Sequence, residues 1–180
     1  MYKPAQIIDE IEKLIGHYEE RDPLTLAEAM DILVSCEPMG YGDNCCKGFF
    51  VSYYGIRHIT VNSDLPDVLR QVILAHELGH AVLHRHAGDP SFVDIAIFDS
   101  VDPKEYEANL FTAELLLDDN DVISTLKETN NFFQTASVLG VPSELLDFKF
   151  KLLRHKGFAF KSPVTASGDF LRRVPYANIV

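Results

Sequence analysis

The spacing of apolar residues predicts a chain that is mostly helical, with one strand-rich segment in its first half. Isoleucine and leucine recur at helical intervals within residues 7–15, which predicts a first amphipathic helix. A second, short helix is expected from Thr25, as its cap, to about Leu33. Residues 47–54 and 56–62 are rich in aromatic and β-branched residues around a glycine, and this pattern predicts an antiparallel hairpin.

A longer helix is predicted directly after the hairpin, from Leu65 to about Leu83. Residues 62–64 supply capping side chains, and Pro66 suits the first turn of a helix. At about 100° per residue, one face of this helix carries both apolar residues and two histidines. The residues on that face are Leu69, Val72, Ile73, His76, His80 and Leu83. The histidines are therefore expected to face the protein interior.

The second half of the chain reads as a series of helices. Asp102 and Pro103 form a cap and first turn for a helix that ends near residue 117. Further helical patterns cover residues 121–129, 131–139 and 143–153, an arrangement that resembles a helix-turn-helix. Residues 85–101 are expected to form a loop, and the tail from residue 157 is expected to be irregular.

These patterns together predict an α+β fold, in which a mostly helical domain has a small antiparallel sheet before its longest helix. Residues 1–120 would form the core that carries the chemistry. Residues 121–180 would form a C-terminal helical subdomain with an irregular tail. Since the hairpin leads into the long helix, its edge is the expected place for an extended peptide to bind through backbone hydrogen bonds.

The long helix contains the motif His76-Glu77-Leu78-Gly79-His80, which indicates a zinc site. Two imidazoles four residues apart lie on one helical face, a spacing suited to one Zn²⁺ ion. The glutamate between them can act as a general base on a water molecule at the metal. The alternative is a pair of core histidines satisfied by hydrogen bonds, with Glu77 solvated.

A catalytic zinc site needs a third protein ligand. His84 continues the spacing, but eight residues of helix rise about 12 Å, so His76 and His84 cannot share one ion; His84 is expected to be an outer or packing residue. Among the downstream carboxylates, Glu105 points toward packed surface, whereas Glu107, Glu114 and Asp118 are expected to form a solvated stripe. The alternative for Glu105 is a capping box with Asp102.

These two motifs resemble those of the ImmA/IrrE-type metallopeptidases, with the ImmA branch the most similar. That family joins a helical H-E-x-x-H to a later E-x-x-A-[ND]-x-F-A-x-x-L-L, and here residues 105–116 read EYEANLFTAELL. The resemblance extends over roughly residues 25–155. It implies one zinc ion per chain, held by His76, His80 and Glu105. Where the family often continues Leu-Leu-x-Pro, this chain has Asp118 and Asp119.

The expected reaction is zinc-assisted peptide hydrolysis. Zinc would polarise the scissile carbonyl, while Glu77 would take a proton from water and return it to the leaving amine. A further group is needed for the developing oxyanion. The candidates are Tyr53, Tyr54, Tyr106 and His155, among which the sequence does not choose. Asn109 is a candidate to steady a ligand, or an ordinary polar contact.

The resemblance implies a protein substrate, typically a helix-turn-helix repressor of a mobile element or stress regulon, whose limited cleavage gives derepression. The repressor would here be a separately encoded partner. Two rival hypotheses remain. The protein would be a non-catalytic regulator that sequesters its repressor and keeps zinc for structure only, or a transcription factor that binds DNA through its C-terminal helices.

Composition indicates a cytoplasmic protein and argues against nucleic-acid and membrane binding. The first residues do not resemble a signal peptide, and no apolar run approaches membrane-spanning length. The net charge is −11, which disfavours phosphate binding. Residues 144–180 hold 7 basic and 3 acidic residues, for which packing or protein docking is the favoured role. The three cysteines, Cys36, Cys45 and Cys46, suit reduced thiols better than disulfides.

Overall fold

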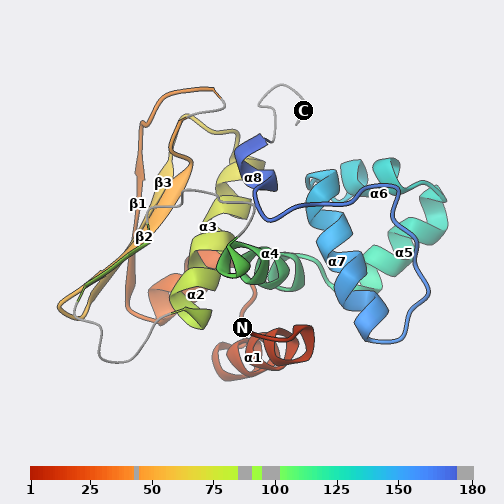
Figure 1. The fold of residues 1–180 in the computed structure, drawn as a ribbon, viewed down its shortest axis with the longest axis horizontal. Coiled ribbons are helices and arrows are strands. Elements are labelled where there is room, and N and C mark those ends of the chain that lie inside the picture. The colour runs from red at the N-terminus through yellow and green to blue at the C-terminus, as the bar shows by residue number, and fades with distance from the viewer. Residues whose placement is uncertain (43–44, 85–90, 95–101, 174–180) are drawn as a thin grey trace.

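A computed structural model describes residues 1–42, 45–84, 91–94 and 102–173 of the 180-residue chain. Within these residues the chain forms eight helices and four strands (Figure 1). In chain order they are α1 (Pro4–Tyr18), α2 (Pro23–Ala29), β1 (Ile32–Glu37), β2 (Gly48–Tyr53), β3 (Ile56–Asn62), α3 (Asp67–Leu83), β4 (Ser91–Asp94), α4 (Pro103–Leu116), α5 (Asp119–Thr129), α6 (Phe132–Val138), α7 (Ser143–His155) and α8 (Phe170–Arg173). The predicted α+β class, mostly helical, is confirmed.

The sheet is small and mixed, with the strand order β1-β3-β2-β4. Strands β2 and β3 form the predicted hairpin, and its two-residue turn, Tyr54-Gly55, has positive φ at both positions. Such a turn matches the right-handed twist of the flanking strands. Strand β1 adds to β3 in parallel, and β4 adds to β2 in antiparallel. The sheet is therefore not purely antiparallel, although the hairpin at its centre is.

This strand order corrects one expectation about peptide binding. Within the described residues, β3 is paired on both sides and β2 is paired with β4 over Phe50–Tyr53, so the hairpin offers little open edge there. The terminal strands of the order are β1 and β4. An extended peptide that joins this sheet would have to pair with one of these two strands.

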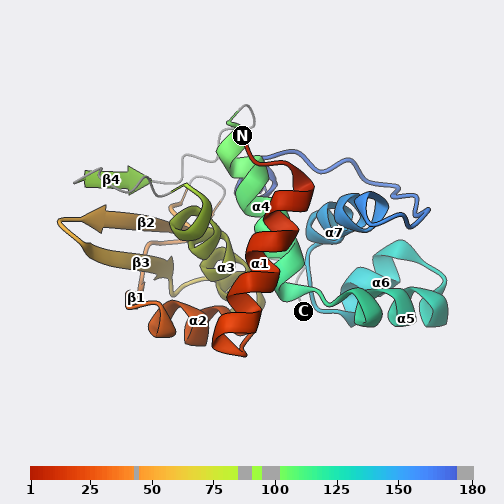
Figure 2. The ribbon, with the colours of Figure 1, turned by 90° about the horizontal axis from the view of Figure 1, so that it is seen from below.

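Helix α3 lies between the sheet and α4 (Figures 1 and 2). Every residue from Val72 to Ala81 is buried, which follows from contact with β2 and β3 on one side and with α4 on the other. Along β2 the burial alternates, so that Gly48, Phe50 and Ser52 face this layer while Phe49 and Val51 are half-buried. The alternation is that of a sheet with one face packed on a core.

Helix α4 occupies the middle of the molecule, since it contacts α1, α3 and α7 (Figure 2). Ten of its residues are buried, and they include Glu107, Asn109 and Glu114. The expectation that Glu107, Glu114 and Asp118 form a solvated stripe is therefore wrong for the two glutamates. A helix covered on several sides has no broad polar face, so its acids need partners inside the protein.

The N-terminal helices also differ from the sequence expectation in one place. Helix α2 ends at Ala29, and the cap at its start is Asp22, which accepts a hydrogen bond from the backbone N–H of Thr25 at 2.9 Å. Ile32 and Leu33, which were expected to end this helix, belong to β1. Asp31, with φ of 56°, turns the chain between the two elements.

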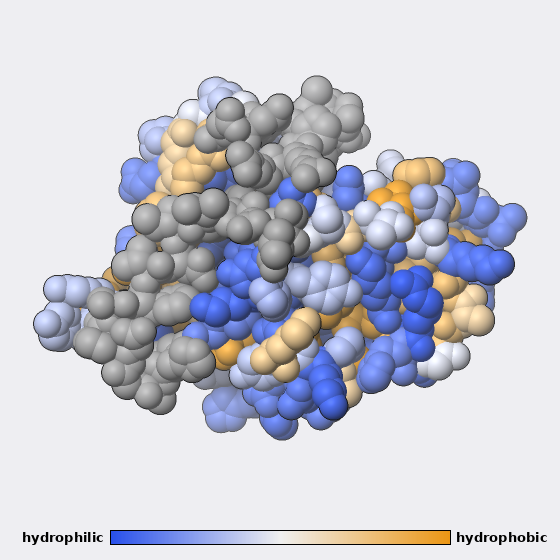
Figure 3. Space-filling model, in the orientation of Figure 1, coloured by the Kyte–Doolittle hydropathy of each residue, from blue (hydrophilic) through white to orange (hydrophobic). Residues whose placement is uncertain are grey.

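The C-terminal helices α5, α6 and α7 lie at the three predicted places and share one hydrophobic core with the rest of the chain. Most of residues 85–101 lies outside the described part, but β4 shows that the predicted loop contains a strand. On the face seen in Figure 3, hydrophobic residues of the described part lie in separate patches among hydrophilic ones. Among the described helices, none is both long and apolar enough to span a bilayer.

Candidate metal centre

Helix α3 places His76 and His80 side by side in the interior. Both side chains are fully buried, and their rings are 4.8 Å apart between centroids. The two Nε2 atoms are 3.1 Å apart, as expected for residues one helical turn apart on the same face. The two imidazoles therefore present nitrogen atoms to the same point.

Helix α4 brings Glu105 to that point from the other side. The Asp102 side chain caps the helix by accepting from the backbone N–H of Lys104 at 2.8 Å. The Glu105 carboxylate turns inward, with Oε2 at 3.2 Å from Nε2 of His76 and Oε1 at 3.3 Å from Nε2 of His80. Since both carboxylate oxygens face the histidines, these contacts do not match the capping-box alternative.

These three side chains fit the donor set of a zinc site. All three are buried, and one ligand atom from each can be chosen so that the atoms lie within 4.8 Å of one another. Atoms bonded to one tetrahedral Zn²⁺ at about 2.0–2.1 Å lie about 3.3 Å from each other. The two Nε2 atoms, of His76 and His80, are 3.1 Å apart, and they lie 3.2 Å from Oε2 and 3.3 Å from Oε1 of Glu105, respectively, which are all close to this value. Two imidazoles and one carboxylate are also a known catalytic zinc set.

The electrostatics of Glu105 keep it ionised. Burial raises the pKa of its carboxyl group, but hydrogen bonds from His76 and His80 and the charges of these rings lower it more, to about 2. A carboxylate that stays ionised at neutral pH is the form that binds a metal. The site thus has a fixed negative charge beside two nitrogen donors.

Glu77 lies next to this cluster in the sequence and is also fully buried. Its side chain runs along the start of β2, since its Cγ is 3.6 Å from the point where a Cβ on Gly48 would lie. Gly48 has no room for such an atom, which would come within 2.5 Å of Cγ2 of Ile73. The close approach of β2 to α3 therefore depends on this glycine and places a strand beside Glu77.

Behind His80 lies a second pair of polar residues that sequence reasoning did not connect. Nδ1 of His84 is 3.0 Å from Nδ1 of His80, and Nε2 of His84 is 3.1 Å from Oε2 of Glu107. His84 is an outer residue of the cluster, as expected, but Glu107 is its partner and is not solvated. The signal available in the sequence was the spacing 80, 84 on α3 and 105, 107 on α4.

Asn109 lies one turn beyond Glu105 and is fully buried. Its amide donates to the carbonyl oxygen of Gly168 at 2.7 Å, so it anchors the C-terminal segment that leads into α8. The fully buried Lys47, just before β2, donates from Nζ to the carbonyl oxygen of Leu171 in the same segment. Within the described residues 157–173 the tail is irregular up to α8, and it is attached to the elements that carry the cluster.

The four candidates for an oxyanion-stabilising group lie in different parts of the fold. Tyr53 and Tyr54 lie at the turn of the hairpin and are 55% and 75% exposed. The ring of Tyr106 packs against Phe148 of α7 at 5.4 Å between centroids, and His155 is the last residue of α7.

The three cysteines are free thiols in the structure. Cys36 is exposed, whereas Cys46 is half-buried, with its Sγ at 3.6 Å from the carbonyl oxygen of Gly48. Burial raises the pKa of the Cys46 thiol, and the charge of Glu77 raises it further. Cys46 is therefore a protonated neighbour of the motif glutamate.

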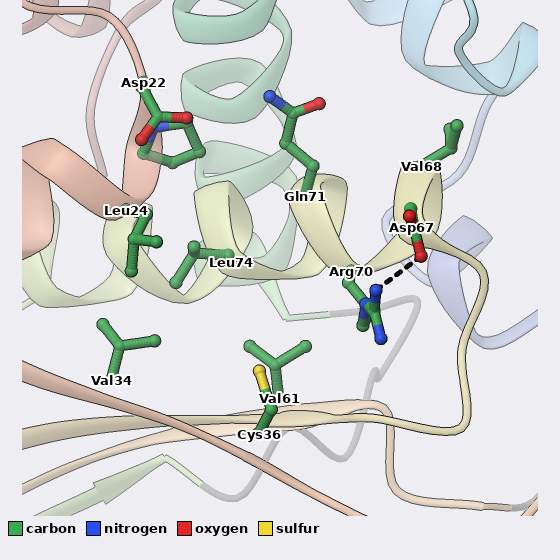
Figure 4. A pocket seen from close by; sticks show the side chains of 11 residues that line it. Asp22, Leu24, Val34, Cys36, Val61, Asp67, Val68, Arg70, Gln71 and Leu74 are labelled. Carbon is green, nitrogen blue, oxygen red and sulfur yellow. Dashed lines mark hydrogen bonds and ion pairs between the residues drawn. The ribbon is translucent and has the colours of Figure 1, made fainter.

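A separate pocket of about 420 Å³ lies between α2, α3 and the strands β1 and β3 (Figure 4). Its walls are largely apolar, with Val34, Val61 and Leu74 facing one another and the ion pair of Asp67 with Arg70 at one end. Leu74 precedes His76 by two residues, so it points about 200° away around α3. The pocket thus lies on the opposite side of this helix from the histidine cluster.

Comparison with known proteins shows which family this chain is similar to. The family model of the IrrE N-terminal-like domain matches residues 27–151, which include α3 and α4. The chain is 36% identical to the "Uncharacterized immunity region protein 2" of Bacillus phage phi105, over 77% of this chain and 85% of that protein. It is 33% identical to the "Metallopeptidase ImmA" of Bacillus subtilis (strain 168), over 51% of this chain and 53% of that protein.

Proposed function

The chain belongs to the ImmA/IrrE-type family of metallopeptidases, and from this premise we propose that it is a zinc-dependent endopeptidase. We assign the zinc ion to His76, His80 and Glu105, and the proton transfer to Glu77. The observation that carries the proposal is the convergence of two buried imidazoles and one buried carboxylate from α3 and α4. Their spacing suits a single zinc ion better than three independent core residues.

Each residue has a distinct part in this proposal. Zinc, when bound, would act as a Lewis acid toward the scissile carbonyl and lower the pKa of a water molecule toward about 7. Glu77 would accept the proton of that water and then donate it to the leaving amine nitrogen. Glu105, as a ligand of the zinc, would remain a carboxylate throughout the reaction.

An extended segment of the substrate would bind along β4. This strand ends the sheet on the side of β2, with which it pairs over Phe50–Tyr53, and β2 begins at Gly48 beside Glu77. An open strand edge binds a peptide through backbone hydrogen bonds, which give affinity but little preference for sequence. We therefore expect the choice of substrate to depend on contacts outside this strand.

The proposed substrate is a separately encoded helix-turn-helix repressor, cut at a limited site so that its genes are derepressed. Similarity to a phage immunity region protein and to ImmA supports this choice of protein class. The basic residues of the C-terminal helices give little support to the rival DNA-binding hypothesis. Lys149 is 1% exposed and, with Lys156, pairs with Glu114 and Asp119.

Metal content tests the proposed ligands. Purified wild-type protein should hold one zinc per chain by mass spectrometry, and Glu105→Ala and His80→Ala should each lose it. His58→Ala is the matched control, because His58 is a half-buried histidine of β3 that hydrogen-bonds Ser35. Full zinc retention in Glu105→Ala would remove that residue from the site, and wild type without zinc after zinc is supplied would contradict the metal assignment.

A Glu77→Gln variant separates catalysis from sequestration. It should keep the wild-type zinc content, yet cleave the repressor about 10²–10⁴-fold more slowly, since it lacks the general acid–base group. Mass spectrometry of the repressor fragments, with reporter expression measured in parallel, gives both readouts. If Glu77→Gln derepresses as well as wild type, the non-catalytic regulator becomes the better description.

A further inference from the structure

We propose that Glu107 and His84 are positioning residues that act through His80, by fixing its ring and strengthening it as a metal ligand. The inference rests on the proposed function, because it assigns Nε2 of His80 to the metal. It concerns a carboxylate that the ligand set does not include and that lies two residues after Glu105 on α4.

The observed contacts form a continuous series from His80 to the backbone of Tyr2, near the N-terminus. Nδ1 of His80 lies 3.0 Å from Nδ1 of His84, and Nε2 of His84 lies 3.1 Å from Oε2 of Glu107. The other carboxylate oxygen, Oε1, accepts the backbone N–H of Tyr2 at 2.7 Å. His80, His84 and Glu107 are all at most 4% exposed, so water competes little for these contacts.

Metal binding at His80 would determine which ring nitrogens of His80 and His84 carry a proton. If Nε2 of His80 gives its lone pair to the metal, the neutral ring carries its proton on Nδ1 and donates it. Nδ1 of His84 must then accept, which leaves the proton of His84 on Nε2. That N–H then points at Oε2 of Glu107, a carboxyl oxygen that accepts it at 3.1 Å. Each of the two contacts thus joins one N–H donor to one acceptor atom.

Such an arrangement affects the metal in two ways. A carboxylate that accepts a hydrogen bond orients a ligand histidine and raises its basicity, and loss of such a partner typically costs about 10–100-fold in metal affinity. Here the carboxylate acts across one additional imidazole. The same contacts also join α3 to α4 at a second point beyond Glu105, and so hold His80 at its place.

Zinc affinity in matched variants tests the proposal. Glu107→Gln should bind zinc about 10–100-fold more weakly than wild type in competition with a chromophoric chelator. Glu114→Gln is the control, since Glu114 is a buried carboxylate of the same helix that pairs with Lys149 and Lys156 and has no contact with His84 among those described. Its zinc affinity should stay within about threefold of wild type, although it loses stability too.

The ring protons give a second readout that a purely structural role would not determine. In zinc-loaded wild type, two-bond ¹H–¹⁵N spectra of the imidazoles should show His80 protonated on Nδ1 and His84 protonated on Nε2. A proton on Nδ1 of His84 would overturn the proposal, because that atom could not then accept from His80.

The outcomes distinguish this inference from the proposed function. If wild type binds zinc tightly and Glu107→Gln binds it equally tightly, the positioning role is wrong and the zinc site stands. If wild type binds no zinc at all, the zinc site and the positioning role both fall. Weaker zinc binding in Glu107→Gln alone, with the expected ring protons, would establish the role.

Discussion

Burial shifts the pKa values of two neighbouring residues, Glu105 and His84, in opposite directions. It raises the pKa of Glu105, where two histidines reverse the effect. It lowers the pKa of His84, and the charge of His80 lowers it further, so that the hydrogen bond with Glu107 only partly offsets them and the pKa is about 4. At neutral pH His84 is therefore a neutral ring that can both donate and accept.

The lowered pKa of His84 predicts a specific acid response of the metal-free protein. Between pH 6.5 and about 4 the unfolded chain binds a proton at this residue that the folded chain does not. The contribution of His84 to the free energy of unfolding should therefore be fully present above pH 6.5. It should be lost progressively as the pH falls from 6.5 toward 4. Urea titrations in the presence of a chelator measure this free energy. Between pH 6.5 and 4 it should fall less steeply for His84→Gln than for wild type. Parallel curves for the two proteins would contradict the assignment.

The residues of the cluster differ in how far their positions could be predicted from the sequence. His76 and His80 are one turn apart, so helical periodicity alone places them together. Glu105 is 29 residues beyond His76, and its inward direction is predicted only by its place off the polar stripe of α4 and by the family resemblance. Glu107 was assigned to solvent because a helical projection assumes one exposed face, and only the packed structure shows α4 covered by α1, α3 and α7.

At the level of elements, the metal centre depends on how closely α3 and α4 approach, and Gly79 permits that approach. A Cβ at this position would lie 3.0–3.3 Å from three side-chain atoms of Phe111, which is fully buried on α4. Alanine in a helix interior normally gains about 0.5–1 kcal/mol over glycine. Here we expect the crowding to dominate, because overpacking of a core typically costs about 1–3 kcal/mol.

Gly79→Ala should therefore lower both stability and zinc affinity, since it pushes Glu105 away from the histidines. Urea unfolding and chelator competition measure the two effects. Gly16→Ala in α1 is the control, because a Cβ there would meet no heavy atom within 4 Å and the variant should be more stable than wild type. A second change, Phe111→Leu, should restore part of the zinc affinity of Gly79→Ala. Unchanged zinc affinity in Gly79→Ala would show that the helix spacing is not limiting.

The elements themselves were predictable where their signals are local. The hairpin, the motif helix and the helices from residue 103 to 155 follow from periodicity, caps and turns, and they lie where expected. Strand β1 was missed because its partner, β3, is 25 residues away in parallel register, as in the pair Val34 with Ile59. A six-residue strand with mixed burial has no alternation to reveal it.

At the scale of the whole molecule, the metal centre lies within one continuous core. The hydrophobic cluster runs from Ile7 in α1 to Leu171 in α8 and includes residues of α3, α4 and α7. Helix α4 carries Glu105 near one end and contacts α7 through Tyr106 with Phe148 and through Glu114 with Lys149. Asn109 and Lys47 hold the C-terminal segment to the same elements. The proposed C-terminal subdomain, residues 121–180, is thus packed against the part that would bind zinc.

This continuity predicts that zinc stabilises helices far from the metal. A ligand that binds only the folded state at 100 times its dissociation constant adds about 2.7 kcal/mol to the free energy of unfolding. If the described core unfolds as one unit, the slowest-exchanging amides of α7 should gain this protection together with those of α3. Hydrogen exchange followed by mass spectrometry, with and without zinc, measures both helices at once, and Glu105→Ala should show the gain in neither. Protection confined to α3 and α4 would mean that α7 opens independently, and residues 121–180 would then behave as a separate folding unit despite the shared core.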